Sequence, residues 1–153
     1  MTSPPNKQRR KLLAAGVAVA VAVAGPVLAT PAEMAAAISA FTGGAVATAG
    51  RVRLDVAALV DNGNAVPVSV AVDSPMTAAD HVTAIAIFNE RNPQTDVVKF
   101  TLGPRAGKAM VSTRIRMATS QKLTAVARMS DGSFWSSSAD VIVTLAACIE
   151  GEG

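Results

Sequence analysis

The stretch that decides the fold is VPVSVAVD at residues 66–73, in which valine occupies every second position. This spacing puts Val66, Val68, Val70 and Val72 on one face of an extended chain, and Pro67, Ser69, Ala71 and Asp73 on the other. Strict alternation of this kind is typical of an antiparallel strand with one buried face and one face near solvent.

The same period recurs along the chain from residue 51 onward. In KLTAVARM (122–129) the inward residues are Leu123, Ala125, Ala127 and Met129, and the outward residues are Lys122, Thr124 and Arg128. In VSTRIRM (111–117) the inward residues are Val111, Ile115 and Met117, and the outward residues are Ser112, Arg114 and Arg116. Further strands are predicted at 52–59, 82–88, 96–102 and 134–145, and turn motifs such as DNGN, DSPM, RNPQ and SDG separate them. About seven strands with these turns predict an all-β, immunoglobulin-like antiparallel β-sandwich. A small barrel is the alternative.

The composition agrees with one small domain. The chain has 153 residues, of which half are apolar and only 3% aromatic. One domain and a thin core rich in valine and alanine are expected from these values.

The first 29 residues have the organisation of a secretory signal peptide. A basic start that includes Arg9 and Arg10 leads into an apolar run at 12–24, and Val27-Leu28-Ala29 follows as a small-residue cleavage site. We expect cleavage after Ala29, with Ala32 as the second choice. A membrane-spanning helix fits less well, because the run is rich in alanine and glycine and is broken by Pro26.

The stretch QRRKLL (8–13) resembles a twin-arginine export signal, in which paired arginines precede a mild apolar region. An accidental arginine pair in a general secretory signal is the alternative. Either route predicts a periplasmic protein with no membrane anchor after cleavage.

Removing residues 1–29 changes the charge of the chain. Lys plus Arg falls from 14 to 10 against 11 acidic residues, so the net charge falls from +3 to −1. The mature protein therefore lacks the basic excess that nucleic-acid binding requires.

Residues 30–50 form a separate segment before the strands. The alanine-rich stretch 31–41 predicts a short helix that ends at Gly43-Gly44. Two interpretations are open: a helix that docks a partner, or a weakly ordered arm.

The chain has few residues of the kinds that form catalytic or metal-binding sites. One histidine, His81, and one cysteine cannot supply the ligands of a zinc site, and no cofactor is expected. GPRAGK (103–108) lacks the spacing of a phosphate-binding loop and is interpreted as a turn. Phe134-Trp135 could form a binding patch, but at least one of the two is expected to pack in the core.

Cys148 is the remaining candidate site. It follows the last alternating strand, in the tail AACIEGEG at 146–153. An unpaired cysteine in an exported protein indicates a reactive thiol or an intermolecular bond, whereas burial as an apolar residue is the alternative. The nearby Glu150 and Glu152 favour an exposed thiol.

Several blocks resemble the SoxY family, the sulfur carrier proteins of the thiosulfate-oxidising Sox system. They are DNGNAVPVSVAVDSPMTAADHV, LGPRAGKAMVSTRIRMATSQKLTAVARMSDGSFW and DVIVTL with a cysteine three residues on. The resemblance implies an immunoglobulin-like periplasmic protein without activity of its own. It implies that Cys148 carries the sulfur intermediate covalently.

The resemblance also implies partners. These are a SoxZ-like β protein in a heterodimer, a cytochrome that couples thiosulfate to the thiol, a hydrolase that releases sulfate and a sulfane dehydrogenase. The expected organisation is a signal peptide at 1–29, a helix or arm at 30–50, the sandwich at 51–145 and a carrier arm at 146–153.

The tail departs from the family pattern. In the family the cysteine is flanked by glycine pairs, GGCGG, whereas here alanines precede Cys148 and Ile149-Glu150 follow it. A non-carrying binding or assembly protein, accessory to a periplasmic dehydrogenase, is therefore the alternative function. A stand-alone enzyme is a distant third.

Overall fold

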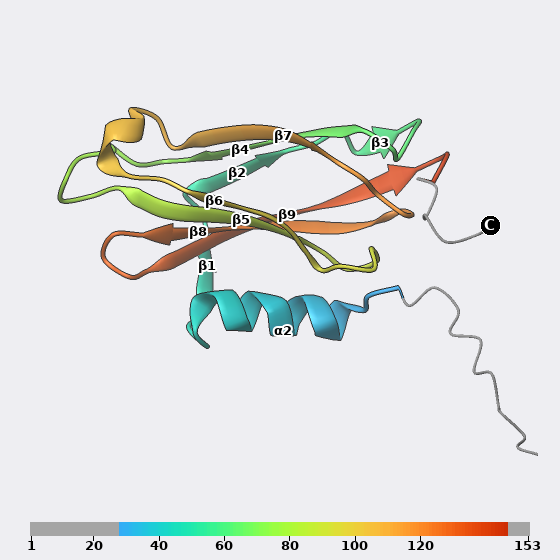
Figure 1. Ribbon diagram of the computed structural model, residues 1–153, viewed down its shortest axis with the longest axis horizontal. Coiled ribbons are helices and arrows are strands. Elements are labelled where there is room, and N and C mark those ends of the chain that lie inside the picture. Colours follow the sequence, from blue (N-terminus) through green and yellow to red (C-terminus); the bar gives the residue numbers. More distant parts are fainter. Residues whose placement is uncertain (1–27, 147–153) are drawn as a thin grey trace, which may run out of the picture.

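Two β-sheets packed face to face, with one helix against the outer face of the larger sheet, make up residues 28–146, the part of the chain that the computed structural model describes (Figure 1). The helix is α2 (Pro31–Thr42) and a short 3-10 helix is η1 (Pro104–Ala106). The strands are β1 (Ala47–Ala49), β2 (Val52–Asp55), β3 (Leu59–Val60), β4 (Val66–Val72), β5 (Val82–Asn89), β6 (Asp96–Thr101), β7 (Met110–Ile115), β8 (Gln121–Met129) and β9 (Phe134–Val143).

The larger sheet has the strand order β1-β9-β8-β5-β6, with β3 also paired to β9, and the smaller sheet has the order β2-β4-β7. All pairs among the longer strands are antiparallel. The predicted immunoglobulin-like sandwich with a short N-terminal helix is therefore confirmed. The predicted signal peptide, residues 1–29, lies outside the described residues except for its last two positions, Leu28 and Ala29.

The core lies between the sheets and follows the predicted alternation. Val66, Val68, Val70 and Val72 are each at most 7% exposed, and they face Ile85, Ile87, Leu123 and Met129 of the larger sheet. Packing of these two apolar faces supplies the main driving force for the fold.

One predicted strand is wrong. Residues 52–59 do not form a continuous strand: β2 pairs with β4 in the smaller sheet, and β3 pairs with β9 in the larger. The chain passes from one sheet to the other between Asp55 and Leu59. The parallel pairings of β1 and β3 with β9 were not foreseen, because strands of two or three residues are too short to show a period.

The helix begins and ends where the sequence indicates. Thr30 and Glu33 form a capping box, in which the Thr30 amide donates to the Glu33 carboxylate (2.7 Å) and the Glu33 amide donates to the Thr30 hydroxyl (3.3 Å). Gly43 closes the helix in the left-handed conformation, with φ of 64°. A helix of 12 residues is marginal in isolation, so its packing on the sheet accounts for its stability.

That packing forms a second, smaller apolar cluster. Met34 and Phe41 of α2 contact Phe88, Val126 and Phe134 on the outer face of the larger sheet. The ring of Phe41 lies edge-on to Phe88 and to Phe134, with centroid distances of 5.9 Å in both cases. The segment is thus a docked helix, and the interpretation as a weakly ordered arm is wrong for residues 31–42.

Candidate functional site

The predicted carrier residue, Cys148, lies outside the described residues, which end at Ala146. The structure therefore informs this site through the segment that leads to it. That segment is the end of β9, together with residues 58–63, which run beside it.

Residues 58–63, here called the arm clamp, hold the chain up to Leu145 by main-chain hydrogen bonds. The amides of Ile142, Thr144 and Leu145 donate to the carbonyls of residues 58, 60 and 61, at 2.8, 3.0 and 3.2 Å. In return the Gly63 amide donates to the Leu145 carbonyl at 2.8 Å, and the Thr144 hydroxyl donates to the Asp61 carbonyl at 3.1 Å. Within residues 28–146, Leu145 is therefore the last residue held on both its amide and its carbonyl.

A serine hydroxyl supports the same strand from the opposite side. The Val143 amide donates to the Ser120 hydroxyl oxygen at 2.9 Å. Ser120 lies in the turn that precedes β8, so segments on both sides of β9 contribute to the anchoring of its end. The end of β9 is consequently part of the rigid sandwich.

Two turns and the start of the described chain meet at this end of the molecule (Figure 1). The Ala29 amide donates to the Asn92 carbonyl at 3.1 Å, and the Asn92 side-chain oxygen accepts from the Ala118 amide and the Gln121 side chain, at 2.9 and 2.8 Å. The Met117 amide donates to the Gly63 carbonyl at 2.8 Å, which ties this network to the arm clamp. The predicted cleavage site and the end of β9, which leads to the predicted carrier arm, thus lie at one end of the sandwich.

The base of the arm exposes large apolar side chains. Leu59 of the arm clamp is 59% exposed, as is Ile142 of β9, and Leu145 is 62% exposed. Leu59 and Ile142 are register partners, so their side chains are neighbours on one face of the sheet. Sequence analysis did not single out these residues, because an exposed leucine or isoleucine has no signature until its strand partner is known.

The other candidates from the sequence are separate from this base. His81 has its Nδ1 3.0 Å from the Thr77 carbonyl oxygen, in the segment that precedes β5. Residues 103–108 form a turn around η1, between β6 and β7, as predicted. Phe134 packs under α2, whereas Trp135 packs against the main core, so both aromatic residues are used in packing.

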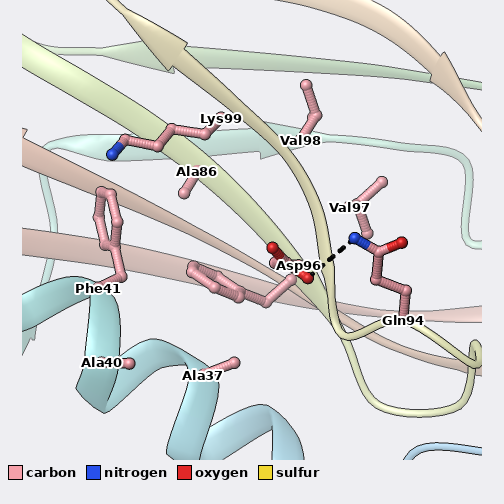
Figure 2. Close-up of a pocket in the computed structure, with 10 residues that line it drawn as sticks. Ala37, Ala40, Phe41, Ala86, Gln94, Asp96, Val97, Val98 and Lys99 are labelled. Carbon is pink, nitrogen blue, oxygen red and sulfur yellow. Dashed lines mark hydrogen bonds between the residues drawn. The ribbon is translucent and has the colours of Figure 1, made fainter.

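A pocket of about 510 Å³ lies beside α2, on the side of the sheet formed by β5 and β6 (Figure 2). Ala37, Ala40 and Phe41 point into it from the helix, opposite the strand residues Val98 and Lys99. The Lys99 ammonium lies 5.6 Å from the centre of the Phe41 ring. The lining is mostly apolar and suits packing or docking rather than acid–base chemistry.

Within residues 28–146 no group of three or more His, Cys, Asp and Glu side chains is placed to hold a metal ion. None of the helices in this part of the chain has the length and apolar character to cross a bilayer.

Comparison with protein families gives a match to the family described as "Sulfur oxidation protein SoxY", over residues 38–148. The match extends through the sandwich and the arm clamp to Cys148. Among curated proteins, none is similar enough in sequence to count as a match.

Solved structures give a consistent result. The sulfur carrier protein SoxY from Chlorobium limicola f thiosulfatophilum has a TM-score of 0.61 and 29% identity, over 74% of this chain and 98% of that one. A superoxide reductase (neelaredoxin) from Ignicoccus hospitalis has a TM-score of 0.56 at 15% identity, over 61% of this chain and 80% of that one. A putative superoxide reductase from Thermotoga maritima has a TM-score of 0.53 at 19% identity, over 67% and 89%. At such low identity, the two reductases share only the fold with this chain.

Proposed function

Since the chain belongs to the SoxY family of sulfur oxidation proteins, we propose that it carries sulfur intermediates covalently on Cys148 during thiosulfate oxidation in the periplasm. The observation that carries this proposal is the family match over residues 38–148, which ends on the only cysteine of the chain. The protein is then a substrate of partner enzymes and has no catalytic activity of its own.

The anchoring of β9 supports a carrier role in physical terms. A thiol that must enter several active sites in turn has to project from the body of its protein. In the described part of the chain, the last residue held on both main-chain groups is Leu145, and Cys148 follows three residues later in the sequence. The body stays rigid up to the start of the arm, so partners can recognise one surface while they act on the thiol.

The chemistry of one cycle balances with three classes of partner. In the first step the Cys148 thiol and thiosulfate form a sulfur–sulfur bond, the thiol proton is released, and two electrons pass to the haem groups of a cytochrome. In the second step a hydrolase cleaves the bond between the outer sulfane sulfur and the sulfonate, and water supplies the fourth oxygen of sulfate. A sulfane dehydrogenase then oxidises the outer sulfur of the persulfide on Cys148 to a sulfonate, with oxygens from water and the electrons passed to an electron acceptor. Hydrolysis of this sulfonate releases a second sulfate and restores the Cys148 thiol.

The proposed signal-peptide cleavage site after Ala29 lies directly before the N-cap of α2. Cleavage after Ala29 would leave Thr30 as the first residue, which retains both members of the capping box with Glu33. Cleavage after Ala32 would remove Thr30 and its cap. Loss of an N-cap costs roughly 1 kcal/mol of helix stability, so the protein cleaved after Ala29 would have the more stable helix.

A Cys148→Ser variant tests the proposal. In cells grown on thiosulfate, intact-protein mass spectrometry should find sulfur-containing adducts on the wild type and none on the variant. Thiosulfate-dependent oxygen uptake should also be lost, because serine cannot form the sulfur–sulfur bond. A Ser138→Ala variant, changed in the sandwich and away from the arm, is the control and should retain adducts and oxygen uptake.

The sequence AACIEGEG favours a second function, because it lacks the glycine pairs of the family motif. A Cys148→Ser strain that oxidises thiosulfate at the wild-type rate would contradict the carrier role. It would support a non-carrying binding or assembly protein, accessory to a periplasmic dehydrogenase.

A further inference from the structure

The turn DNGN at 61–64, between β3 and β4, contains the one asparagine of the chain that is directly followed by a glycine, Asn62–Gly63. Because glycine has no Cβ, the main-chain nitrogen of Gly63 can approach the side-chain amide carbon of Asn62 closely. Attack by this nitrogen releases the side-chain amide group as ammonia, the reaction known as deamidation. The pair therefore has the highest intrinsic reactivity of the asparagines in this chain.

The side chain that would be attacked is accessible and polarised. Asn62 is exposed to solvent. Its side-chain oxygen accepts hydrogen bonds from the Asn64 main-chain amide at 2.9 Å and from the Asn64 side-chain amide at 3.0 Å. Donors at this oxygen stabilise the negative charge that develops on it when the amide carbon is attacked. The electrophile of the reaction is thus already prepared in the folded protein.

The attacking nitrogen, in contrast, is restrained. Gly63 is buried, its amide donates to the Leu145 carbonyl at 2.8 Å, and its carbonyl accepts from the Met117 amide at 2.8 Å. The Gly63 nitrogen has to lose its proton and turn towards the Asn62 side chain before it can attack, and the hydrogen bond to Leu145 opposes both changes. Gly63 must therefore leave the arm clamp before the reaction can occur.

The hydrogen bond that restrains Gly63 lies at the edge of the folded body. Leu145 follows the end of β9 and is 62% exposed, so few side-chain contacts hold it in place. The Thr144 hydroxyl, which donates to the Asp61 carbonyl at 3.1 Å, adds a side-chain hydrogen bond at the same position. Segments with few buried contacts open locally far more often than the core unfolds. Opening here frees the Gly63 amide while the sandwich stays folded.

We propose that Asn62–Gly63 is a deamidation site, protected while the arm clamp is closed and reactive when it opens. The deprotonated Gly63 nitrogen forms a bond to the Asn62 side-chain amide carbon. The bond from that carbon to the side-chain nitrogen breaks, and ammonia leaves after taking a proton from water. Water then hydrolyses the resulting succinimide ring to aspartate or isoaspartate, so the reaction consumes one water molecule and needs no cofactor.

Both products weaken the arm clamp. Isoaspartate routes the main chain through the former side chain and lengthens it by one carbon, so Gly63 can no longer meet Leu145 and Met117 at the same time. Aspartate places a second negative charge next to Asp61. Deamidation is irreversible in the absence of a repair enzyme, so it converts a transient opening of the clamp into a permanent one. The reaction involves no sulfur chemistry and is independent of the proposed carrier function.

The test follows deamidation of the purified full-length protein at mildly alkaline pH, in water enriched in heavy oxygen. Peptide mapping by mass spectrometry measures the label that enters residue 62, in the native protein and in the protein unfolded by urea. The native rate should be at least about tenfold lower than the unfolded rate. Asn92 is the internal control: it is followed by Pro93, whose nitrogen carries no proton, so this route is closed to it in both states. Asn62→Gln should abolish labelling at position 62.

Thr144→Val tests the role of the arm clamp. Valine keeps the branched shape of threonine but cannot donate to the Asp61 carbonyl, so the native rate should rise about twofold or more while the unfolded rate stays the same. Thr124→Val is the matched control, because it removes a side-chain hydrogen bond to Ser138 on the outer face of the sheet, and its native rate should equal that of the wild type.

Hydrogen exchange provides a measurement that needs no variant. In the wild type at urea concentrations below unfolding, exchange of the Gly63 amide and deamidation of Asn62 should accelerate by the same factor, since both need the same opening. Equal deamidation rates in the native and the unfolded protein would overturn the proposed protection. A native rate that does not follow Gly63 exchange would show that the clamp does not control the reaction, and an unlabelled residue 62 in the unfolded protein would exclude the site.

Discussion

At the scale of single residues, the turn between β8 and β9 holds a carboxylate with a perturbed pKa. The Asp131 carboxylate accepts hydrogen bonds from the Ser133 hydroxyl at 2.6 Å and from the Ser133 amide at 2.8 Å. These bonds favour the charged form, the hydroxyl more than the amide, and Arg51 adds a smaller attraction, so the pKa of Asp131 is lowered from 3.8.

Ser133 also links this turn to the body of the sandwich. Its hydroxyl oxygen accepts a hydrogen bond from the Trp135 indole at 3.2 Å, and the Arg51 guanidinium lies 5.6 Å from the centre of the same ring. Gly50, which precedes Arg51, has φ of 116°. A Cβ added at this position would lie 3.5 Å from the Trp135 ring. Glycine is needed there, because other residues rarely adopt this conformation.

A Ser133→Ala variant should raise the pKa of Asp131 towards 3.8, because the strongest hydrogen bond to the carboxylate is lost. Because the folded-state pKa is lowered, Asp131 stabilises the wild type above pH 3.8, and this contribution disappears as the pH falls through the folded-state pKa. The variant should therefore be less stable than the wild type near neutral pH and differ less from it at strongly acidic pH. NMR titration of the carboxyl carbon and urea unfolding at both pH values would measure the two effects.

The control is Ser138→Ala, since Ser138 bonds to Thr124 on the outer face of the sheet. It should leave the titration of Asp131 unchanged. An Asp131 pKa that is the same in Ser133→Ala and in the wild type would contradict the assigned cause.

At the scale of elements, α2 and the larger sheet stabilise each other. The helix covers Phe88, Val126 and Phe134, which would otherwise expose a large apolar area on the outer face. Phe41 is the centre of this contact, because its ring packs against both Phe88 and Phe134 beneath the helix. Edge-on aromatic pairs add about 0.5–1.5 kcal/mol to the free energy of burial.

A Phe41→Ala variant should lower the free energy of unfolding by roughly 2–3 kcal/mol, below the range for fully buried phenylalanines because the ring borders the pocket. Amides of α2 should exchange with solvent faster than those of β8, because the helix detaches before the sandwich unfolds. Urea denaturation and hydrogen exchange would measure these effects. Lys99→Ala removes only the cation above the Phe41 ring and should cost less than about 1 kcal/mol; an equal loss in both variants would contradict the account.

At the scale of the whole molecule, the sandwich is small and its core is thin. Valine is the commonest buried residue between the sheets, alanine, isoleucine and methionine are equally frequent after it, and Leu123 is the one leucine of this buried cluster. A domain of this size buries a smaller fraction of its surface than a larger one, so its stability is expected to be modest. A binding partner would therefore add substantially to its stability.

Co-expression with a SoxZ-like β protein should give a stable heterodimer, and the melting temperature should rise with the concentration of that partner. Size-exclusion chromatography with light scattering and a thermal melt series would measure both. An unrelated immunoglobulin-like β protein at the same concentration should change neither. Elution of the co-expressed protein as a monomer would contradict the prediction.

Features that repeat locally could be predicted from the amino-acid sequence. The alternation of valine in β4 and of apolar residues in β8 requires one buried face, so the strands, the sandwich and the composition of the core could be predicted. The cap at Thr30 and the end at Gly43 are local as well, so the limits of α2 were predictable to within one residue. Cys148 stood out because it is the only cysteine and follows the last strand.

Features that depend on partners far apart in the chain became visible only in the folded structure. Leu59 and Ile142 are 83 positions apart, and neither is unusual until β3 pairs with β9 and makes them neighbours on an exposed face. The same pairing splits the predicted strand 52–59 between two sheets, and residues 58–63 hold the chain as far as Leu145. A strand of two residues has no period of its own; its position depends on hydrogen bonds to another strand, and those exist only once the sandwich has formed.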